Sequence, residues 1–145
     1  MSNIVFKKVL LAVDDSEQSH RAAVKTAILA QEGIIGEIVL FNVYDSGTID
    51  ITKLHNQEKL DELRAESSRI LKKYENLLKE KNVHCKLKRA GGDPAALILD
   101  LVENDGEYEL IIMGNRKLNW FQELAFGSVS DKVTRMSNIP VLIIK

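Results

Sequence analysis

The chain has 145 residues and a formal net charge of −1, with 45% hydrophobic and 28% charged residues. This length fits one domain, residues 1–145, and the composition excludes a largely disordered chain. The near-neutral charge gives no sign of nucleic-acid binding, and no apolar run reaches the roughly 18–20 residues that span a bilayer.

Cysteine and histidine are sparse. Cys85 is the only cysteine, so neither an intrachain disulfide nor a cysteine zinc cluster can form. The three histidines are scattered in the sequence, and we expect no metal site and no catalytic residue among them. Lys7 and Lys8 interrupt the first apolar run, and no signal-cleavage pattern follows. We therefore expect a cytoplasmic protein with no membrane association.

The first half of the chain alternates short apolar runs with helical patterns. Lys8–Val13 is a continuous apolar run, which is typical of a strand buried on both faces, and a helix capped by Asp15 or Ser16 should follow it. Glu37–Tyr44 predicts the second strand. The long charged segment that ends near Lys81 has apolar residues at three- and four-residue steps. That spacing favours a helix laid over a sheet; a coiled coil or partner-binding helix is the alternative.

The second half continues the alternation. Val83–Arg89 alternates apolar and polar residues, which predicts a half-exposed strand near a sheet edge. Asp93 followed by proline predicts the start of a helix, with Asp93 as its cap. Glu109–Gly114 is the fourth predicted strand, and a loop, a helix over about 128–136 and a fifth strand within 139–145 complete the pattern.

This order predicts a single doubly wound parallel sheet with helices on both faces. In such sheets ligands bind outside the carboxyl ends of the strands, where the winding reverses. The candidate positions therefore follow each strand directly. They are Asp14 and Asp15, Tyr44 and Asp45, Ala90 and Gly91, and Met113 to Lys117.

The stretch from Met113 to Val133 has the features of an anion site. Gly114 ends a buried strand, where a missing side chain permits a sharp turn and close approach of a ligand. Gly127 and Ser128 begin a helix, whose free N–H groups favour an anion. Further hydroxyl donors and positive charges in the same stretch are Ser128, Ser130, Arg116 and Lys117. The alternative is purely structural, with a Ser128–Asp131 capping box and a glycine that serves only the turn.

Several sharper motifs are absent. The chain has no G-x-x-x-x-G-K-[ST] and no G-x-G-x-x-G after a strand, which disfavours a P-loop nucleotide triphosphatase and a dinucleotide site of that type. Asp14 and Asp15 resemble the acidic pair of a receiver domain. The third strand, however, ends in KRAGG, with no aspartate to accept phosphate. Helix capping is therefore the simpler role for Asp15.

Four blocks of the sequence carry a resemblance that covers nearly the whole chain. They are VLLAVDDSEQS, LFNVYD, GGDPAALILDLVENDGEYELIIMGNR and FGSVSDKVTRMSNIPVLIIK. Their order and spacing resemble the universal stress protein family. The resemblance implies an adenine-nucleotide α-hydrolase-like fold, with five parallel strands in the order 3-2-1-4-5, and a homodimer.

The resemblance also implies a nucleotide site. Members that bind ATP carry G-x2-G-x9-G-[ST], which is matched here by Gly114, Gly127 and Ser128, while Lys117 replaces the second glycine. Residues after the first strand would line adenine and ribose, Val43 would contact the base, and residues at the last helix would hold phosphates. The expected nucleotide-binding set is Ala12, Val13, Asp14, Val43, Met113, Gly114, Arg116, Lys117, Gly127, Ser128, Val129 and Ser130.

Lys117 leaves two outcomes open. If the motif requires positive φ at this position, lysine costs about 1 kcal/mol, which corresponds to roughly a tenfold change in affinity. If the motif requires a close approach of backbone to phosphate, the side chain would block it. A lysine also carries the charge that phosphate attracts, so we favour retained but weakened binding.

Three functions remain to be compared. The leading hypothesis is a small cytoplasmic stress-response regulator that binds ATP or a related adenine nucleotide, with Mg²⁺ accompanying the phosphates, and dimerises through its apolar C-terminal strand. The second is a ligand-free dimeric interaction module of the same fold. The third, an ATP pyrophosphatase, would carry S-G-G-x-D-S after the first strand, where this chain has AVDDSEQS. With no evident general base or metal ligands, we expect no enzyme activity beyond slow ATP hydrolysis.

Overall fold

The computed structural model describes residues 3–46, 50, 52–115 and 129–145. Strands and helices alternate along these residues. In chain order they are β1 (Phe6–Ala12), α1 (Glu17–Gln31), β2 (Ile35–Tyr44), α2 (Leu54–Glu80), β3 (Lys86–Gly91), α3 (Pro94–Asp105), β4 (Leu110–Gly114), α5 (Val129–Met136) and β5 (Val141–Ile144).

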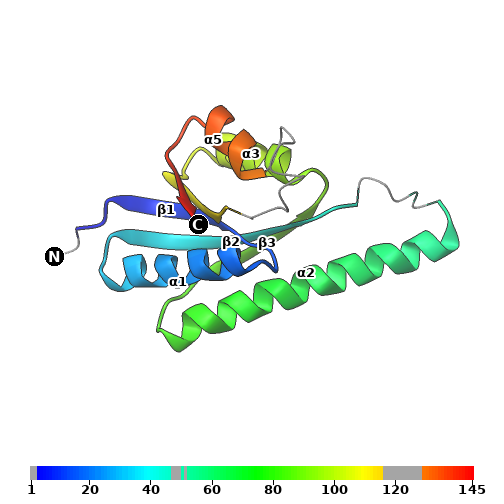
Figure 1. Cartoon of the computed structure of the whole chain (residues 1–145), viewed down its shortest axis with the longest axis horizontal. Helices are drawn as coiled ribbons and strands as arrows, with labels where there is room; N and C mark the ends of the chain where they lie inside the picture. Colours follow the sequence, from blue (N-terminus) through cyan, green and yellow to red (C-terminus); the bar gives the residue numbers. More distant parts are fainter. Residues whose placement is uncertain (1–2, 47–49, 51, 116–128) are drawn as a thin grey trace.

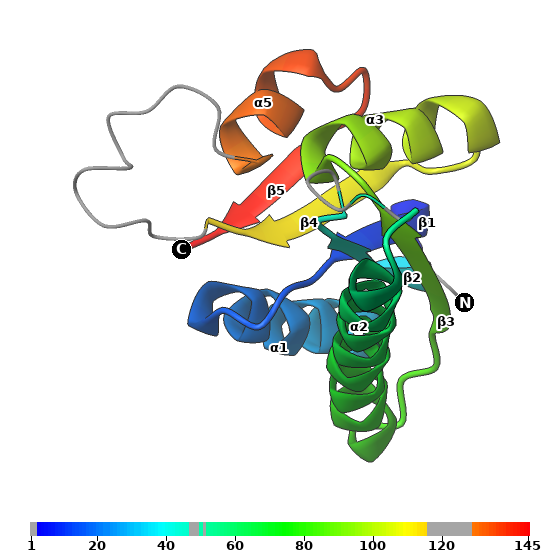
Figure 2. The same cartoon turned by 90° about the vertical axis from the view of Figure 1, so that its right-hand side faces the viewer.

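The five strands form one parallel sheet in the order β3-β2-β1-β4-β5. This confirms the predicted sheet and its 3-2-1-4-5 order. Helices α1 and α2 cover one face of the sheet, and α3 and α5 cover the other (Figures 1 and 2). The chain winds outward from β1 to β3 on one side and returns through β4 to β5. The winding therefore reverses between β1 and β4, which are neighbours in the sheet.

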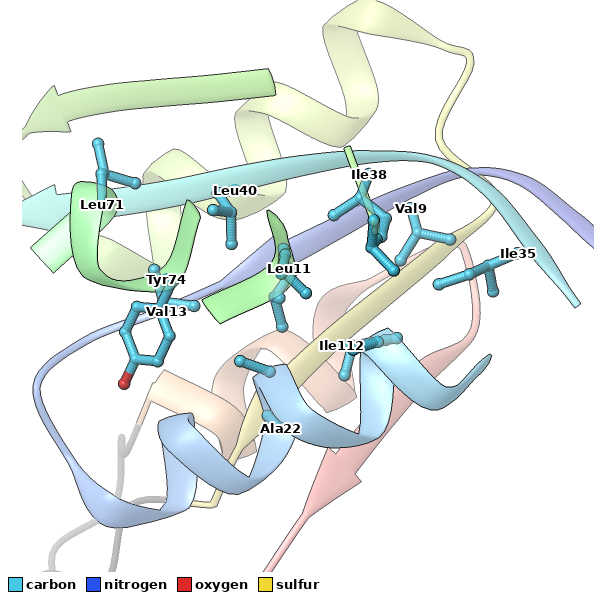
Figure 3. Close-up of a cluster of buried hydrophobic side chains, with 14 of the residues drawn as sticks. Val9, Leu11, Val13, Ala22, Ile35, Ile38, Leu40, Leu71, Tyr74 and Ile112 are labelled. Atoms are coloured by element: carbon cyan, nitrogen blue, oxygen red, sulfur yellow. The ribbon is translucent and has the colours of Figure 1, made fainter. Parts of the chain in front are cut away.

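Two apolar layers enclose the sheet. The layer under α1 and α2 includes Leu11, Tyr74 and Ile112 (Figure 3), and the layer under α3 and α5 includes Leu10 and Ile111. Adjacent residues of β1 thus belong to opposite layers, and all of Val9 to Leu11 are fully buried. Each buried apolar side chain contributes on the order of 1.5–3 kcal/mol, which explains why a continuous apolar run forms the central strand.

Helix α2 lies over the β2 and β3 side of the sheet, as its apolar spacing predicts. Ile70, Leu71, Tyr74 and Leu78 recur at one- to four-residue steps and are buried, while most of the intervening residues are exposed. Its amino-terminal part extends beyond the sheet (Figure 1). None of the helices within the described ranges combines the length and apolar character needed to cross a bilayer.

The start of α1 corrects one expectation. Ser16, not Asp15, is the N-cap, since its hydroxyl accepts the Ser19 N–H at 3.1 Å. The Asp15 carboxylate instead points to α2, where it pairs with Arg69 at 3.3 Å and Lys73 at 3.4 Å. The extended backbone of Ser16 makes it the N-cap, so Asp15 lies one residue before the cap position. The Asp93 cap, with proline directly after it, forms as predicted.

Strand β3 is an edge strand, as predicted, but nearly all of its residues are exposed where we expected a half-exposed strand, and it begins three residues later. Residues 81–83 complete the end of α2 instead. The Val83 N–H donates to the Leu78 carbonyl at 2.9 Å, and Asn82 adopts a left-handed φ of 61°. The half-buried Cys85 packs against the core, as expected for a structural cysteine.

Burial of Cys85 predicts a loss of stability at alkaline pH. Burial raises the pKa of its thiol from the ordinary 9.0 to about 11, and the nearby Glu75 carboxylate adds to the shift. Because the folded-state pKa is the higher one, the stabilisation is present below pH 9 and is lost as the pH rises toward 11. Urea unfolding at pH 7.5, 9 and 10.5 should show this fall, and Cys85→Ala should reduce it. The buried tyrosines contribute to the pH dependence of both proteins. If the free energy of unfolding fell equally with pH in the wild type and in Cys85→Ala, the contribution of Cys85 would be absent and the prediction would be contradicted.

Candidate functional site

A pocket of about 400 Å³ opens at the carboxyl ends of β1, β2 and β4, next to the point where the winding reverses. Helices α1, α3 and α5 complete its walls, so each of the six contributing elements begins or ends there. Its lining residues are Ala12, Val13, Asp14, Ser19, Phe41, Val43, Asp45, Pro94, Ile98, Met113, Gly114, Val129 and Ser130.

Eight residues of the expected nucleotide-binding set line this one pocket. They come from three strands and one helix that are far apart in the sequence: Ala12, Val13, Asp14, Val43, Met113, Gly114, Val129 and Ser130. The other four, Arg116, Lys117, Gly127 and Ser128, lie outside the described residues. The topology rule for parallel sheets and the family resemblance therefore lead to the same hollow.

Four lining residues were missed in the sequence, whereas a fifth outside the expected nucleotide-binding set, Asp45, was among the candidate positions after the strands. Phe41 is two positions before Val43 on β2, so strand periodicity could have found it. Pro94 and Ile98 lie one helical turn apart at the start of α3, and no sequence signal shows that this helix faces the pocket. The fourth, Ser19, follows the first strand at a distance that the topology rule does not fix.

Hydrogen bonds with residues of β2 and α1 hold the turn between β1 and α1. The Val13 N–H donates to the Phe41 carbonyl at 2.9 Å, and the Val13 carbonyl accepts from Asn42 Nδ2 at 2.8 Å. The Asp14 N–H donates to Ser19 Oγ at 2.9 Å. Since Asn42 is 4% exposed, an unpaired polar group here would be costly, and the network fixes the turn in one conformation.

Asp14 is positioned on both its backbone and its side chain. Tyr74 on α2 donates its hydroxyl to the Asp14 carbonyl at 2.8 Å, and the Asp14 Oδ1 accepts the Ser16 N–H at 2.9 Å. Burial raises the pKa of the Tyr74 hydroxyl, which keeps it protonated as a donor at neutral pH. The half-buried Asp14 carboxylate is thus held at the pocket wall as a directed acceptor.

Gly114 is required by packing between β4 and α1. A Cβ built on it would come within 2.5 Å of the Gln18 carbonyl carbon and 2.6 Å of the Ser19 nitrogen. Both are backbone atoms of the first turn of α1, which cannot move aside without shifting the helix. The space of the missing side chain is therefore occupied by α1, and the ligand approach that we expected does not explain this glycine.

The last helix reaches the pocket through Ser130, which is 8% exposed. Its hydroxyl donates to Asn115 Oδ1 at 3.1 Å. The Asn115 N–H in turn donates to the Ile144 carbonyl at the end of β5, at 2.7 Å. This chain of two hydrogen bonds connects the pocket wall to the edge strand of the sheet.

The chain's own side chains occupy two of the three helix N-termini around the pocket. Ser16 accepts an amide of the first turn of α1 at 3.1 Å, and Asp93 accepts one of the first turn of α3 at 3.0 Å. The third helix, α5, presents Val129 and Ser130 to the hollow. A capping carboxylate and a proline without an N–H make the start of α3 a poor anion site.

The described walls of the pocket carry two carboxylates, Asp14 and Asp45, and no histidine or cysteine. Within the described part of the chain, no group of three His, Cys, Asp or Glu side chains is placed to hold a metal. His20 and His84 are exposed and line no wall of this hollow. Cys85 lies at the opposite end of β3, and its raised pKa keeps the thiol protonated at neutral pH.

Comparison with known proteins gives a consistent result. The model of the universal stress protein family matches residues 6–145. Universal stress protein YxiE of Bacillus subtilis is 30% identical over 149 residues, covering 97% of this chain and all of that protein. Universal stress protein MJ0531 of Methanocaldococcus jannaschii is 26% identical and covers 97% of this chain and 83% of its own length.

Solved structures share the fold. The protein MJ0577 superposes with a TM-score of 0.82 at 26% identity, covering 98% of this chain and 97% of its own. A universal stress protein in complex with cAMP has a TM-score of 0.75 at 21% identity and covers 97% and 98% of the two chains. One from Archaeoglobus fulgidus in complex with dAMP has a TM-score of 0.68 at 18% identity and covers 98% and 100%.

The packing of Gly114 predicts a defect in stability. We expect Gly114→Ala to lower the free energy of unfolding by about 2–3 kcal/mol, because the new methyl group overlaps the backbone of α1. Gly33→Ala is the matched control, since a Cβ there meets nothing within 4 Å and only the positive φ of 75° is strained, which costs about 1–2 kcal/mol. Chemical denaturation measures both. Equal or smaller destabilisation by Gly114→Ala would contradict the packing role.

Proposed function

Because the chain belongs to the universal stress protein family, we propose that it is a stress-response regulator that binds ATP or a related adenine nucleotide. The observation that carries this proposal is the single pocket at the switch point, lined by eight residues of the expected nucleotide-binding set. Related proteins of the same fold are known in complexes with cAMP and dAMP. These ligands share adenine, a ribose-type sugar and a phosphate, which are the three parts that the pocket walls suit.

The base would lie against β2. The Val13 N–H donates to the Phe41 carbonyl, whereas the Gly92 N–H donates to the Tyr44 carbonyl. Backbone groups alternate sides along a strand, so the N–H and carbonyl of Val43 point toward β1, beyond the last β1–β2 residue pair. One donor and one acceptor on the same residue match the edge of adenine, which offers an acceptor nitrogen and an amino group.

The rest of the base would pack on apolar side chains. Phe41, Ile98 and Met113 lie on the α3 side of the sheet and form the pocket's apolar wall, with Pro94 beside them. Aromatic and aliphatic walls with a few directed polar groups are typical of cofactor sites. The Asp14 carboxylate, held by the turn network, would accept a hydrogen bond from a sugar hydroxyl.

The phosphates would lie at the start of α5. Backbone N–H groups and the positive end of the helix dipole favour an anion there, and Ser130 adds a hydroxyl. The acidic residue of this first turn, Asp131, is exposed and pairs with Arg135 at 3.2 Å. Arg116, Lys117, Gly127 and Ser128 would complete the phosphate side, and Mg²⁺ would accompany a triphosphate through water and phosphate oxygens.

This site would bind a nucleotide and turn it over slowly at most. Asp14, the half-buried carboxylate of the wall, is engaged by the Ser16 N–H. A base that activates water must reach the reacting phosphate, and Asp14 lies on the proposed sugar side. We therefore propose a sensor in the cytoplasm, in which occupancy of the pocket is the signal.

The nucleotide proposal predicts the effect of filling the pocket. We expect the natively purified wild-type protein to release an adenine nucleotide on denaturation or to bind ATP in calorimetry, with and without Mg²⁺. Val43→Trp should weaken binding about tenfold or more, because the indole would occupy the base position. Leu87→Trp is the control, since Leu87 is 40% exposed on the neighbouring strand and outside the pocket. No released nucleotide and no heat in the wild type would favour the ligand-free interaction module.

We also propose that the chain acts as a homodimer through β5. The two edges of the sheet differ in charge. The edge strand β3 carries Lys86, Lys88 and Arg89, whereas the other edge strand, β5, has no charged residue and is half-buried. Lysines on an edge strand oppose pairing with another sheet, and an apolar edge without charge favours it.

Exposed apolar side chains flank the β5 edge. The Arg21 Nε donates to the Lys145 carbonyl at 2.9 Å, so this face of α1 lies beside the end of β5. Ile28 is seven residues further along α1, on the same face, and is 43% exposed. Met136, at the end of α5 on the other side of the sheet, is 59% exposed. An isologous contact would cover these residues together with the strand.

The dimer proposal is tested by a proline at the open edge. The carbonyls of Pro140 and Ile144 face β4, so the Ile143 N–H points outward. Ile143→Pro removes that donor and should give monomers in size-exclusion chromatography with light scattering. Leu87→Pro removes an outward N–H from β3 and should leave the dimer intact. A wild-type monomer, or equal effects of the two prolines, would contradict pairing through β5.

A further inference from the structure

We propose that Asn115 is a positioning residue of the pocket, which sets the direction of the Ser130 hydroxyl and thereby its preference for phosphate. This inference rests on the proposed nucleotide site and adds a residue outside the expected nucleotide-binding set. The inference is carried by the side-chain amide of a residue whose backbone is bonded to β5. This amide contacts the one hydroxyl that α5 presents to the pocket within the described residues.

The backbones of both partners are fixed. The Asn115 N–H donates to the Ile144 carbonyl at 2.7 Å, which ties the residue to the last position of β5. Thr134 Oγ1 donates to the Ser130 carbonyl at 2.7 Å, one turn along α5. The two side chains therefore meet in a fixed arrangement, with Ser130 Oγ at 3.1 Å from Asn115 Oδ1. Adjustment at this contact is limited to rotation of the hydroxyl and of the amide.

The direction of this hydrogen bond determines what the pocket presents. A serine hydroxyl has one proton, and here the proton goes to Asn115 Oδ1. The oxygen lone pairs of Ser130 are then left for the pocket, and they repel an anion. Rotation of the amide brings Nδ2 to Ser130 Oγ as the donor. The hydroxyl proton is then free to bond a phosphate oxygen, while Ser130 Oγ keeps Asn115 as its partner.

Asparagine is suited to this exchange because its amide contains an acceptor and two donors on one planar group. An aspartate at position 115 would only accept, would retain the serine proton and would add a negative charge near the phosphate. An alanine would neither accept nor donate. Aspartate keeps the size of the side chain but not its donors, and alanine keeps neither. Comparison of the two substitutions therefore separates the hydrogen bonding of the amide from its space-filling.

The experiment compares ATP and adenosine by calorimetry in the wild type and in variants of position 115. For ATP, we expect Asn115→Ala to weaken binding roughly threefold to tenfold, which is the range of one hydrogen bond, and Asn115→Asp to weaken it further. Adenosine, which lacks phosphate, should bind all three proteins alike. Asn76→Asp, on the exposed face of α2, adds the same charge away from the pocket and should change neither affinity.

A double-mutant cycle tests whether Asn115 acts through Ser130. Since its effect is transmitted by the hydroxyl, Asn115→Ala should have no further effect on ATP affinity in a Ser130→Ala background. Equal losses for ATP and adenosine, or full additivity of the two substitutions, would overturn the inference while leaving nucleotide binding intact. A wild-type protein that binds neither ligand would overturn the proposed function itself, and this inference with it.

Discussion

The turn after β1 is the feature on which the rest of the site depends. It leaves a strand that is buried on both faces, at the sheet position where the winding reverses. Its buried backbone groups need hydrogen-bond partners there. Side chains supply them: Asn42 of β2, Ser19 of α1 and Tyr74 of α2. These contacts fix where Asp14 lies and where the pocket opens. Because folding already orders this wall, a ligand would not have to order it on binding.

The helices of the two layers contribute to the pocket in different ways. On one face, α1 and α2 support the pocket from behind, through the close contact of α1 with Gly114 and the hydroxyl of Tyr74, and α1 also lines it with Ser19. On the other face, α3 and α5 present side chains directly, such as Ile98 and Ser130. Most of the supporting contacts therefore come from α1 and α2, and most of the lining helix residues from α3 and α5. Buried polar residues, and not only lining residues, thus determine the shape of the pocket.

Much of the fold could be predicted from the sequence, because the signals are local. The alternation of apolar runs with helical spacing predicted every described element, and the edge character of β3 followed from its mixed pattern. Strand order came from the family resemblance. What local patterns could not show were long-range choices: that Asp15 would turn to Arg69 and Lys73 on α2, that Gly114 serves the packing of α1, and that Asn115 reaches Ser130. Each depends on a neighbour that only the tertiary structure supplies.

The unequal edges of the sheet have a consequence for assembly. A sheet with two edges that can pair could recruit copies at both ends and grow into an open-ended filament. In the proposed dimer, Lys86, Lys88 and Arg89 on β3 would obstruct one edge, and the uncharged β5 would leave the other open. Growth would then stop as soon as two open ends have met. The basic residues that keep β3 exposed to solvent would thereby limit the assembly to a closed dimer.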